Sequence, residues 1–189
     1  MKKVLFGFLA FAVMAIASGS VSAQMMDRGD NPMVGGAAMY KTKNIVENAV
    51  NSADHTTLVA AVKAAGLVDT LASKGPFTVF APVNSAFDQL PAGTVDMVLK
   101  PENKATLTKI LTYHVLAGNY SAKDVVGAIK KGNGKAAFTT VAGGKLWAML
   151  DGKNVVLMDE KGGRSTVTIA DVKQSNGVIH VVDSVLLPN

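Results

Sequence analysis

Residues 75–87 read GPFTVFAPVNSAF, and the rest of the chain can be arranged around them. Thr78, Val79 and Phe80 form a short run that favours β structure and is entered through a Gly-Pro turn. We expect the run to end at Pro82, because proline has no N–H group to donate within a sheet. The first half of this stretch therefore predicts a strand that stops at a corner.

A short helix is predicted after the corner. Asn84 is placed to cap a helix from Ser85 to about Leu90, and the Pro-Ala-Gly that follows closes it. Phe87, three residues past the cap, is expected to point back toward the strand. The unit contains neither a nucleophile nor a metal ligand, so it indicates a structural corner in preference to a catalytic site.

The first 23 residues have the pattern of a secretory signal peptide. Lys2 and Lys3 supply a positive start, Val4–Ala17 is an apolar run, and Val21–Ala23 ends in small residues suited to cleavage. The apolar run has about 14 residues, whereas a helix needs about 20 to span a bilayer. We therefore expect a secreted or periplasmic protein that does not span the membrane, with an uncleaved N-terminal anchor as the alternative.

Composition limits the classes of partner and of stabilisation. Cleavage of the signal would lower the formal net charge from +5 to +3. The basic residues are scattered, and Lys130-Lys131 is their only adjacent pair after the signal, so no nucleic-acid partner is expected. The chain has no cysteine, which means that stability must come from a hydrophobic core without disulfides.

Residues 24–42 lack hydrophobic periodicity and contain glycine, proline and asparagine, which predicts a flexible leader. The leader contains Arg28-Gly29-Asp30, a tripeptide of the kind that animal integrins read in exposed loops. A given tripeptide also occurs by chance in roughly a few per cent of chains of this length. Methionines in the same segment would suit a soft metal, but no histidine or cysteine accompanies them.

Residues 43–189 read as helices followed by strands. Helix caps are indicated by Asn44, by Asp54 or Thr56 and by Ser121, and Gly66 marks a helix end. Five apolar runs separated by glycine-containing turns read as strands, at 137–141, 146–150, 155–158, 165–170 and 178–187. This order predicts one α+β domain over residues 43–189.

The side chains that usually carry catalysis give no positive signal. The three histidines, His55, His114 and His180, are not at metal-ligand spacing, so neither a zinc site nor another cofactor is expected. His55, at a helix start, is expected to be exposed. A Gly-Asn-Gly at 132–134 follows a helix, which is the wrong context for a dinucleotide loop. We expect a non-enzymatic protein, with a hydrolase as the least supported alternative.

Two histidines lie within apolar segments that read as strands. His114 follows Tyr113, and successive strand residues face opposite sides, so the two side chains are not expected to enter one core. The structural interpretation of His114 and His180 is a half-buried imidazole bonded to a backbone carbonyl or to Asn84 or Asp183. A direct bond between His180 and Asp183 is disfavoured, since they face opposite sides. The functional alternative is a contact patch of Tyr113 and His114 at an exposed strand edge.

Three segments together resemble the conserved blocks of fasciclin domains: TVFAPVNSAF at 78–87, ILTYHVLAG at 110–118 and NGVIHVVDSVLLP at 176–188. Their order and spacing fit essentially the whole predicted domain, and the chain is similar to single-domain, secreted fasciclin proteins of bacteria. Val83 and Ser85 depart from the residues common in the first block, which would alter a surface contact but not the fold. The motif residues carried over are Thr78, Phe80, Pro82, Asn84, Phe87, Gly177, His180 and Asp183.

The resemblance implies a wedge of two β-sheets with a helical layer, in which the first and last blocks pair in the core. It also implies an extracellular adhesion module that binds matrix proteins, integrins, polysaccharide or other cell-surface partners, and we expect a monomer. In animal members the Tyr-His region is implicated in integrin adhesion. Carried over to this sequence, that region indicates Tyr113 and His114, with Val115 and Leu116, as candidate partner-binding residues.

A second hypothesis is a carrier of a small apolar ligand such as a carotenoid or a lipid. Some soluble fasciclin-like proteins of algae are similar to carotenoid carriers. Trp147 and the methionines, nine in the whole chain, leave room for this function. Visible absorbance of the purified natural protein would distinguish a carrier from an adhesion module.

Overall fold

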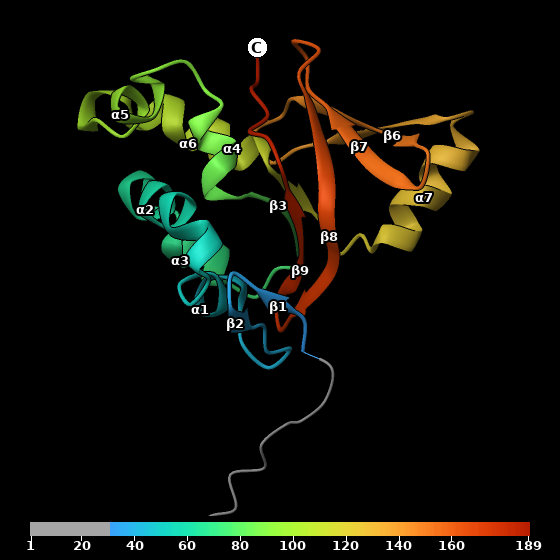
Figure 1. Ribbon diagram of the computed structural model, residues 1–189, viewed down its shortest axis with the longest axis horizontal. Helices are drawn as coiled ribbons and strands as arrows, with labels where there is room; N and C mark the ends of the chain where they lie inside the picture. The colour runs from blue at the N-terminus through green and yellow to red at the C-terminus, as the bar shows by residue number, and fades with distance from the viewer. Residues whose placement is uncertain (1–30) are drawn as a thin grey trace, which may run out of the picture.

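The computed structural model describes residues 31–189 (Figure 1). The predicted signal peptide and Arg28-Gly29-Asp30 lie outside the described residues. In chain order the elements are β1 (Met33–Val34), β2 (Ala37–Ala38), α1 (Ile45–Ala49), η1 (Ala53–His55), α2 (Thr56–Ala65), α3 (Val68–Ala72), β3 (Phe77–Pro82), α4 (Asn84–Asp88), α5 (Thr94–Val98), η2 (Pro101–Asn103), α6 (Lys104–Tyr113), β4 (Val115–Ala117), α7 (Ala122–Lys131), β5 (Lys135–Thr139), β6 (Lys145–Asp151), β7 (Asn154–Met158), β8 (Arg164–Gln174) and β9 (Gly177–Val182).

Seven of these strands form one sheet in the order β4-β3-β9-β8-β7-β6-β5, and β1 and β2 form a separate two-stranded sheet. The long strand β8 joins two halves of the large sheet, because residues 164–166 pair with β7 and residues 167–174 pair with β9. The register shifts on either side of Ile169, an irregularity of the kind that bends and twists a strand. The predicted α+β class, with sheets and a helical layer, is confirmed.

Strands β3 and β9 lie side by side in the middle of the molecule. They pair in parallel, with Phe77 opposite Gly177 and Phe80 opposite His180, so the first and last motif blocks do pair in the core. Every residue of β9 is buried. A Cβ atom at position 177 would overlap the Phe77 carbonyl, which explains why glycine opens this strand. The strand β3 ends at Pro82, as predicted.

The sheet separates two hydrophobic cores. On one face, Val79, Ala81 and Ile179 pack in a cluster with residues of α1, α2, α3 and α6. On the other face, Phe80 and Val182 pack in a cluster with residues of α7 and of β5, β6 and β7. Figure 1 shows helices α1 to α6 on the left of the sheet and α7 on the right. Alternation along β3 therefore supplies side chains to both cores.

Local helix signals are confirmed at three places. Asn44 accepts from the Glu47 N–H at 2.9 Å and Glu47 bonds back to the Asn44 N–H, which makes a capping box at α1. Ser121 and Asp124 form the same arrangement at α7. Helix α2 ends at Gly66, whose φ of 73° lies in the left-handed region that favours glycine.

Asn84 differs from the prediction, because it does not cap the helix that it begins. Val83 is the N-cap of α4 and makes no side-chain capping bond. The Asn84 side chain instead accepts from the Thr57 N–H at 3.1 Å and donates to the Ala53 carbonyl at 2.8 Å. Asn84 therefore caps the first turn of α2 and ties the corner after β3 to that helix.

Residues 31–42 are folded, so the prediction of a flexible leader is wrong for this part of the segment. β1 and β2 pair as a hairpin that places Val34 and Met39 in the core on the side of α1, α2, α3 and α6, which we call the helical-side core. The Gly35 carbonyl accepts from the Ala53 N–H at 3.0 Å and attaches the hairpin to η1. Strands of two residues are too short to produce a hydrophobic period, which is why the sequence pattern did not reveal them.

Several strand boundaries also differ from the predictions, and β5 covers 135–139 instead of 137–141. The strand expected at Tyr113 begins at Val115, because α6 continues through Tyr113. Strand β8 runs to Gln174, past the expected end at 170, and β9 ends at Val182 instead of 187. Boundaries depend on pairing with distant strands, which the local sequence does not contain.

Candidate functional site

The four candidate partner-binding residues lie together at the junction of α6 and β4. Tyr113 is the last residue of α6, His114 is its C-cap, and Val115 and Leu116 belong to β4. Their exposed fractions are 0%, 3%, 4% and 1%. The structure brings these residues together, but inside the protein, so it forms no exposed contact patch from their side chains. Direct partner binding by these residues stays a prediction, and their burial argues for a role in support of the fold.

Tyr113 enters the core that is shared with α7, and its hydroxyl ends on the backbone of two loops. The hydroxyl donates to the Lys145 carbonyl at 2.6 Å and accepts from the Glu160 N–H at 3.3 Å. Burial raises the pKa of Tyr113 to about 12, an effect that the hydrogen bond from Glu160 opposes. Tyr113 therefore links α6 to the start of β6 and to the turn after β7.

His114 lies on the opposite side of the sheet from Tyr113, as expected, although neither residue belongs to a strand and strand alternation is not the reason. Its Nδ1 donates to the Ile110 carbonyl at 2.9 Å, and its Nε2 accepts from the Leu186 N–H at 3.0 Å. Both bonds are satisfied only by the neutral ring with its proton on Nδ1. Burial lowers the pKa of His114, while the bond to Ile110 opposes that shift. The predicted bond to a backbone carbonyl is confirmed, without a contribution from Asn84 or Asp183.

His180 ties β9 to β8 and to the segment before α7. Its Nε2 donates to the Tyr120 carbonyl at 2.8 Å, and its Nδ1 accepts from the Asp171 N–H at 3.3 Å. Asp171 has a φ of 58°, at the irregularity of β8, and its Oδ1 accepts from the Ala122 N–H at 2.7 Å. The His180 ring stacks on Phe80, with centroids 5.7 Å apart. Burial lowers the pKa of His180.

Asp183 bonds to strand β8 near the point where β8 pairs with β7. Its Oδ1 accepts from the Thr166 N–H at 2.7 Å. The two hydrogen bonds of His180 are made with Tyr120 and Asp171. The last motif block is therefore attached to β8 by two side chains, because His180 bonds to Asp171 and Asp183 bonds to Thr166.

His55 is the residue that the sequence misjudged most. It was expected to be exposed, but its exposed fraction is 3%. Its Nδ1 lies 2.8 Å from the Ser52 hydroxyl, whereas its Nε2 makes no hydrogen bond of good geometry within the described residues. Burial lowers the pKa of His55, an effect that the nearby Ala81 carbonyl opposes. The hairpin attached to η1 contributes to this burial, and no local sequence signal points to it.

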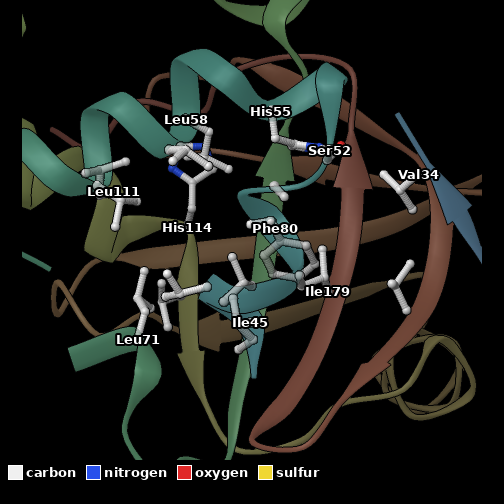
Figure 2. Close-up of a pocket in the computed structure, with 18 of the residues that line it drawn as sticks. Val34, Ile45, Ser52, His55, Leu58, Leu71, Phe80, Leu111, His114 and Ile179 are labelled. Carbon is white, nitrogen blue, oxygen red and sulfur yellow. Dashed lines mark hydrogen bonds between the residues drawn. The ribbon is translucent and has the colours of Figure 1, made fainter. Parts of the chain in front are cut away.

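An apolar cavity of about 60 Å³ lies between the helical layer and the sheet. Figure 2 shows His55 and Ser52 beside each other at one end of it, and His114 near Leu58. The wall is formed by residues of α1, α2, α3, α6, β3 and β9, among them Ile45, Leu58, Leu71, Leu111 and Ile179. Apolar cavities can accept small apolar molecules, and at this wall the Nε2 of His55 is a buried polar atom without a hydrogen-bond partner among the described residues.

Two further classes of site are absent from residues 31–189. No three histidine, aspartate or glutamate side chains of this region come together in a way that would hold a metal ion. No helix of this region is long and apolar enough to cross a membrane.

With the fold and the buried motifs in place, the chain can be assigned to a family. It belongs to the fasciclin family, since the model for the Fasciclin domain matches residues 53–188. It is similar to Protein sll1483 of Synechocystis sp., with 44% identity over 183 residues that cover 96% of this chain and 94% of that protein. It is also similar to Cell surface glycolipoprotein MPB83 of Mycobacterium bovis, with 40% identity over 122 residues that cover 65% of this chain and 48% of the relative.

A solved structure has the same fold. The FAS1 domain pair from the insect cell adhesion molecule Fasciclin I superposes with a TM-score of 0.67 and 19% identity. The match covers 77% of this chain and 51% of that chain, so this protein corresponds to about half of the solved pair. At this identity the likeness is one of fold.

Proposed function

We propose that this protein is an exported, non-enzymatic adhesion or surface-interaction module that binds a protein or polysaccharide partner outside the cytoplasm. Membership of the fasciclin family is the observation that carries this proposal. One matched relative supports it by name, as a cell surface glycolipoprotein. The signal-peptide pattern of residues 1–23 supports export.

The state of the histidines supports a non-enzymatic role. Histidine is the side chain used most often for proton transfer near neutral pH. In this fold His114 and His180 each use both ring nitrogens in hydrogen bonds to the backbone. Burial lowers the pKa of all three histidines and keeps them neutral inside the protein. The ring nitrogens of His114 and His180 are thus used to hold the fold together.

The Tyr-His motif has an indirect part in this proposal. Tyr113, His114, Val115 and Leu116 are buried, so a partner would contact the surface that they support. A variant that disturbs them would then change binding only through the fold.

A capture experiment tests the proposal. Tagged mature protein is incubated with native cell envelope and extracellular matrix, and bound material is identified with and without an excess of untagged protein. The proposal expects a saturable partner that the untagged protein displaces. Capture that no excess displaces, or no capture from either source, would contradict it.

The cavity beneath α2 favours a second candidate function, the carriage of a small apolar ligand. A volume of about 60 Å³ suits a few non-hydrogen atoms and is too small for a carotenoid without an opening of the helical layer. Native mass spectrometry and visible absorbance of the natural protein test this candidate. A bound small molecule would support it. An unliganded, colourless protein whose melting temperature is unchanged by added lipid or carotenoid would contradict it.

A further inference from the structure

The half of the sheet formed by β5, β6, β7 and β8 has two very different faces. The inner face packs on α7 through Ala136, Leu146, Ala148 and Leu157, which are buried. Side chains that are opposite each other in an antiparallel sheet lie on the same face, so the register identifies the outer face as well. Ala137, Trp147, Met158 and Arg164 form one row across it.

A second row lies beside the first on the same outer face. This row consists of Lys135, Met149, Val156 and Thr166, of which Val156 is buried. Lys145 is on the same strand as Trp147 and two residues before it, so it also faces outward. Lys135, Lys145 and Arg164 are exposed, and Trp147, Met149 and Met158 are partly exposed. We call these six residues the Trp147 face.

One of the three cations contacts the indole of Trp147. The Lys135 Nζ is 5.0 Å from the centroid of the Trp147 ring, a cation–π contact that holds the ring and places a positive charge beside it. Arg164 is two strands away in the same row, roughly 10 Å from Trp147 at the usual spacing between strands. The outward charged residues of these strands are the three cations and Asp151, which lies at the far end of β6.

We propose that the Trp147 face binds an acidic polysaccharide, with carboxylate or sulfate groups on Lys135, Lys145 and Arg164 and a sugar ring against Trp147. This inference rests on the proposed function and names the partner class and its surface. Charge complementarity favours an anionic partner, because three of the four outward charged residues on these strands are basic. One carboxylate adjoins this set, since Glu160 accepts from the Lys145 N–H at 2.9 Å. The positions of the charges favour a repeating polymer, since the cations lie on three different strands around one aromatic side chain.

The small amount of exposed apolar surface favours the polysaccharide over an acidic protein. Interfaces between proteins bury an apolar centre within a polar rim. Here the exposed or partly exposed apolar side chains are those of one alanine, one tryptophan and two methionines, and the cations lie on three of the strands that carry them or flank them. A chain of sugar rings can stack on the indole while its anionic groups reach the cations, without needing a larger apolar surface.

Binding of alginate, a uronic acid polymer, tests the inference at low ionic strength, where exposed charges are least screened. The full chain is compared with Trp147→Leu and with Lys135→Gln/Arg164→Gln. The matched control is Lys123→Gln/Lys130→Gln, which removes two exposed charges from α7, on the opposite side of the same half-sheet. We expect each variant of the Trp147 face to bind at least about tenfold more weakly and the control to stay within about twofold of wild type. Neutral dextran should bind far more weakly than alginate.

Three results would overturn the inference. They are no saturable binding of alginate, equal weakening by the control variant, and tighter binding of poly-L-glutamate than of alginate through the same residues. The melting temperature of every variant shows whether it is folded. Capture from native envelope and matrix is run in parallel with the same variants. Capture that persists when alginate binding fails would leave the proposed adhesion function intact and reject only this surface.

Discussion

At the scale of single residues, His114 is the side chain on which the junction of α6, β4 and the C-terminal segment depends. It joins the Ile110 carbonyl to the Leu186 N–H through a neutral ring, inside the protein. On the opposite side of the sheet, the hydroxyl of its neighbour Tyr113 bonds to the backbone of Lys145, at the start of β6, and of Glu160, in the turn after β7. The Tyr-His pair of the family motif therefore connects backbone segments on both sides of the sheet in this protein.

Replacement of His114 by alanine should lower the free energy of unfolding by at least about 2 kcal/mol. The change leaves two buried backbone groups without a partner and enlarges the neighbouring cavity. Urea denaturation followed by circular dichroism measures the effect, with Lys123→Ala on the exposed side of α7 as the control. An unchanged midpoint for His114→Ala would contradict the structural role of this residue.

Acid should destabilise the protein through its buried histidines. The pKa values of His55, His114 and His180 are lowered in the folded state, chiefly by burial. Below the unfolded value of about 6.5, the unfolded chain therefore takes up protons that the folded chain does not, and stability falls as the pH falls. Each histidine contributes up to about 1.4 kcal/mol per pH unit in this range.

Urea midpoints between pH 7.5 and pH 5 measure this dependence, above the range in which ordinary carboxylates titrate. We expect the midpoint to be nearly constant down to about pH 6.5 and to decrease below it. A midpoint that rises or stays level between pH 6.5 and pH 5 would show that the histidines are not buried in the neutral form.

At the scale of elements, some structure can be predicted from local sequence and some cannot. The capping boxes at Asn44 and Ser121 and the end of α2 at Gly66 follow from neighbouring residues, and the structure confirms them. Asn84 has the sequence context of a local cap, but its side chain reaches α2 through the tertiary fold. The predictions of an exposed His55 and of a flexible segment at the hairpin are wrong for the same reason, because distant segments of the chain bury these residues.

Replacement of Asn84 by alanine should remove the cap of α2 and lower the free energy of unfolding by about 1–2 kcal/mol. The neighbouring exposed Ser85 provides the matched control, since Ser85→Ala changes the first turn of α4 without touching α2. Equal effects of the two substitutions in thermal or urea denaturation would contradict the role of Asn84 as a cap of α2.

Deletion of residues 24–39 should destabilise the protein strongly, in contrast to the behaviour of a flexible leader. The deletion removes the buried side chains of Val34 and Met39, each worth about 1.5–3 kcal/mol, and uncovers part of the helical-side core. Deletion of residues 24–30 removes none of these contacts and serves as the control. Melting temperatures that are the same for the two deletions would contradict the packing of the hairpin.

At the scale of the whole molecule, the three motif blocks predicted the family and the pairing of β3 with β9, and both are confirmed. The candidate site was harder to predict. A motif shared across a family does not reveal whether its residues face solvent or the core, and here Tyr113, His114, Val115 and Leu116 are all buried. The outer face around Trp147 has no motif, and only the strand register brings its residues together.

The most direct test of this account compares capture of native envelope and matrix partners by the wild-type chain and by Tyr113→Phe. This variant keeps the buried ring and removes only the hydroxyl that bonds to Lys145 and Glu160. If the motif supports the fold while another surface binds, the folded variant should capture the same partner in the same amount at a slightly lower melting temperature. Loss of the partner at an unchanged melting temperature would contradict the account and place the contact on the motif itself.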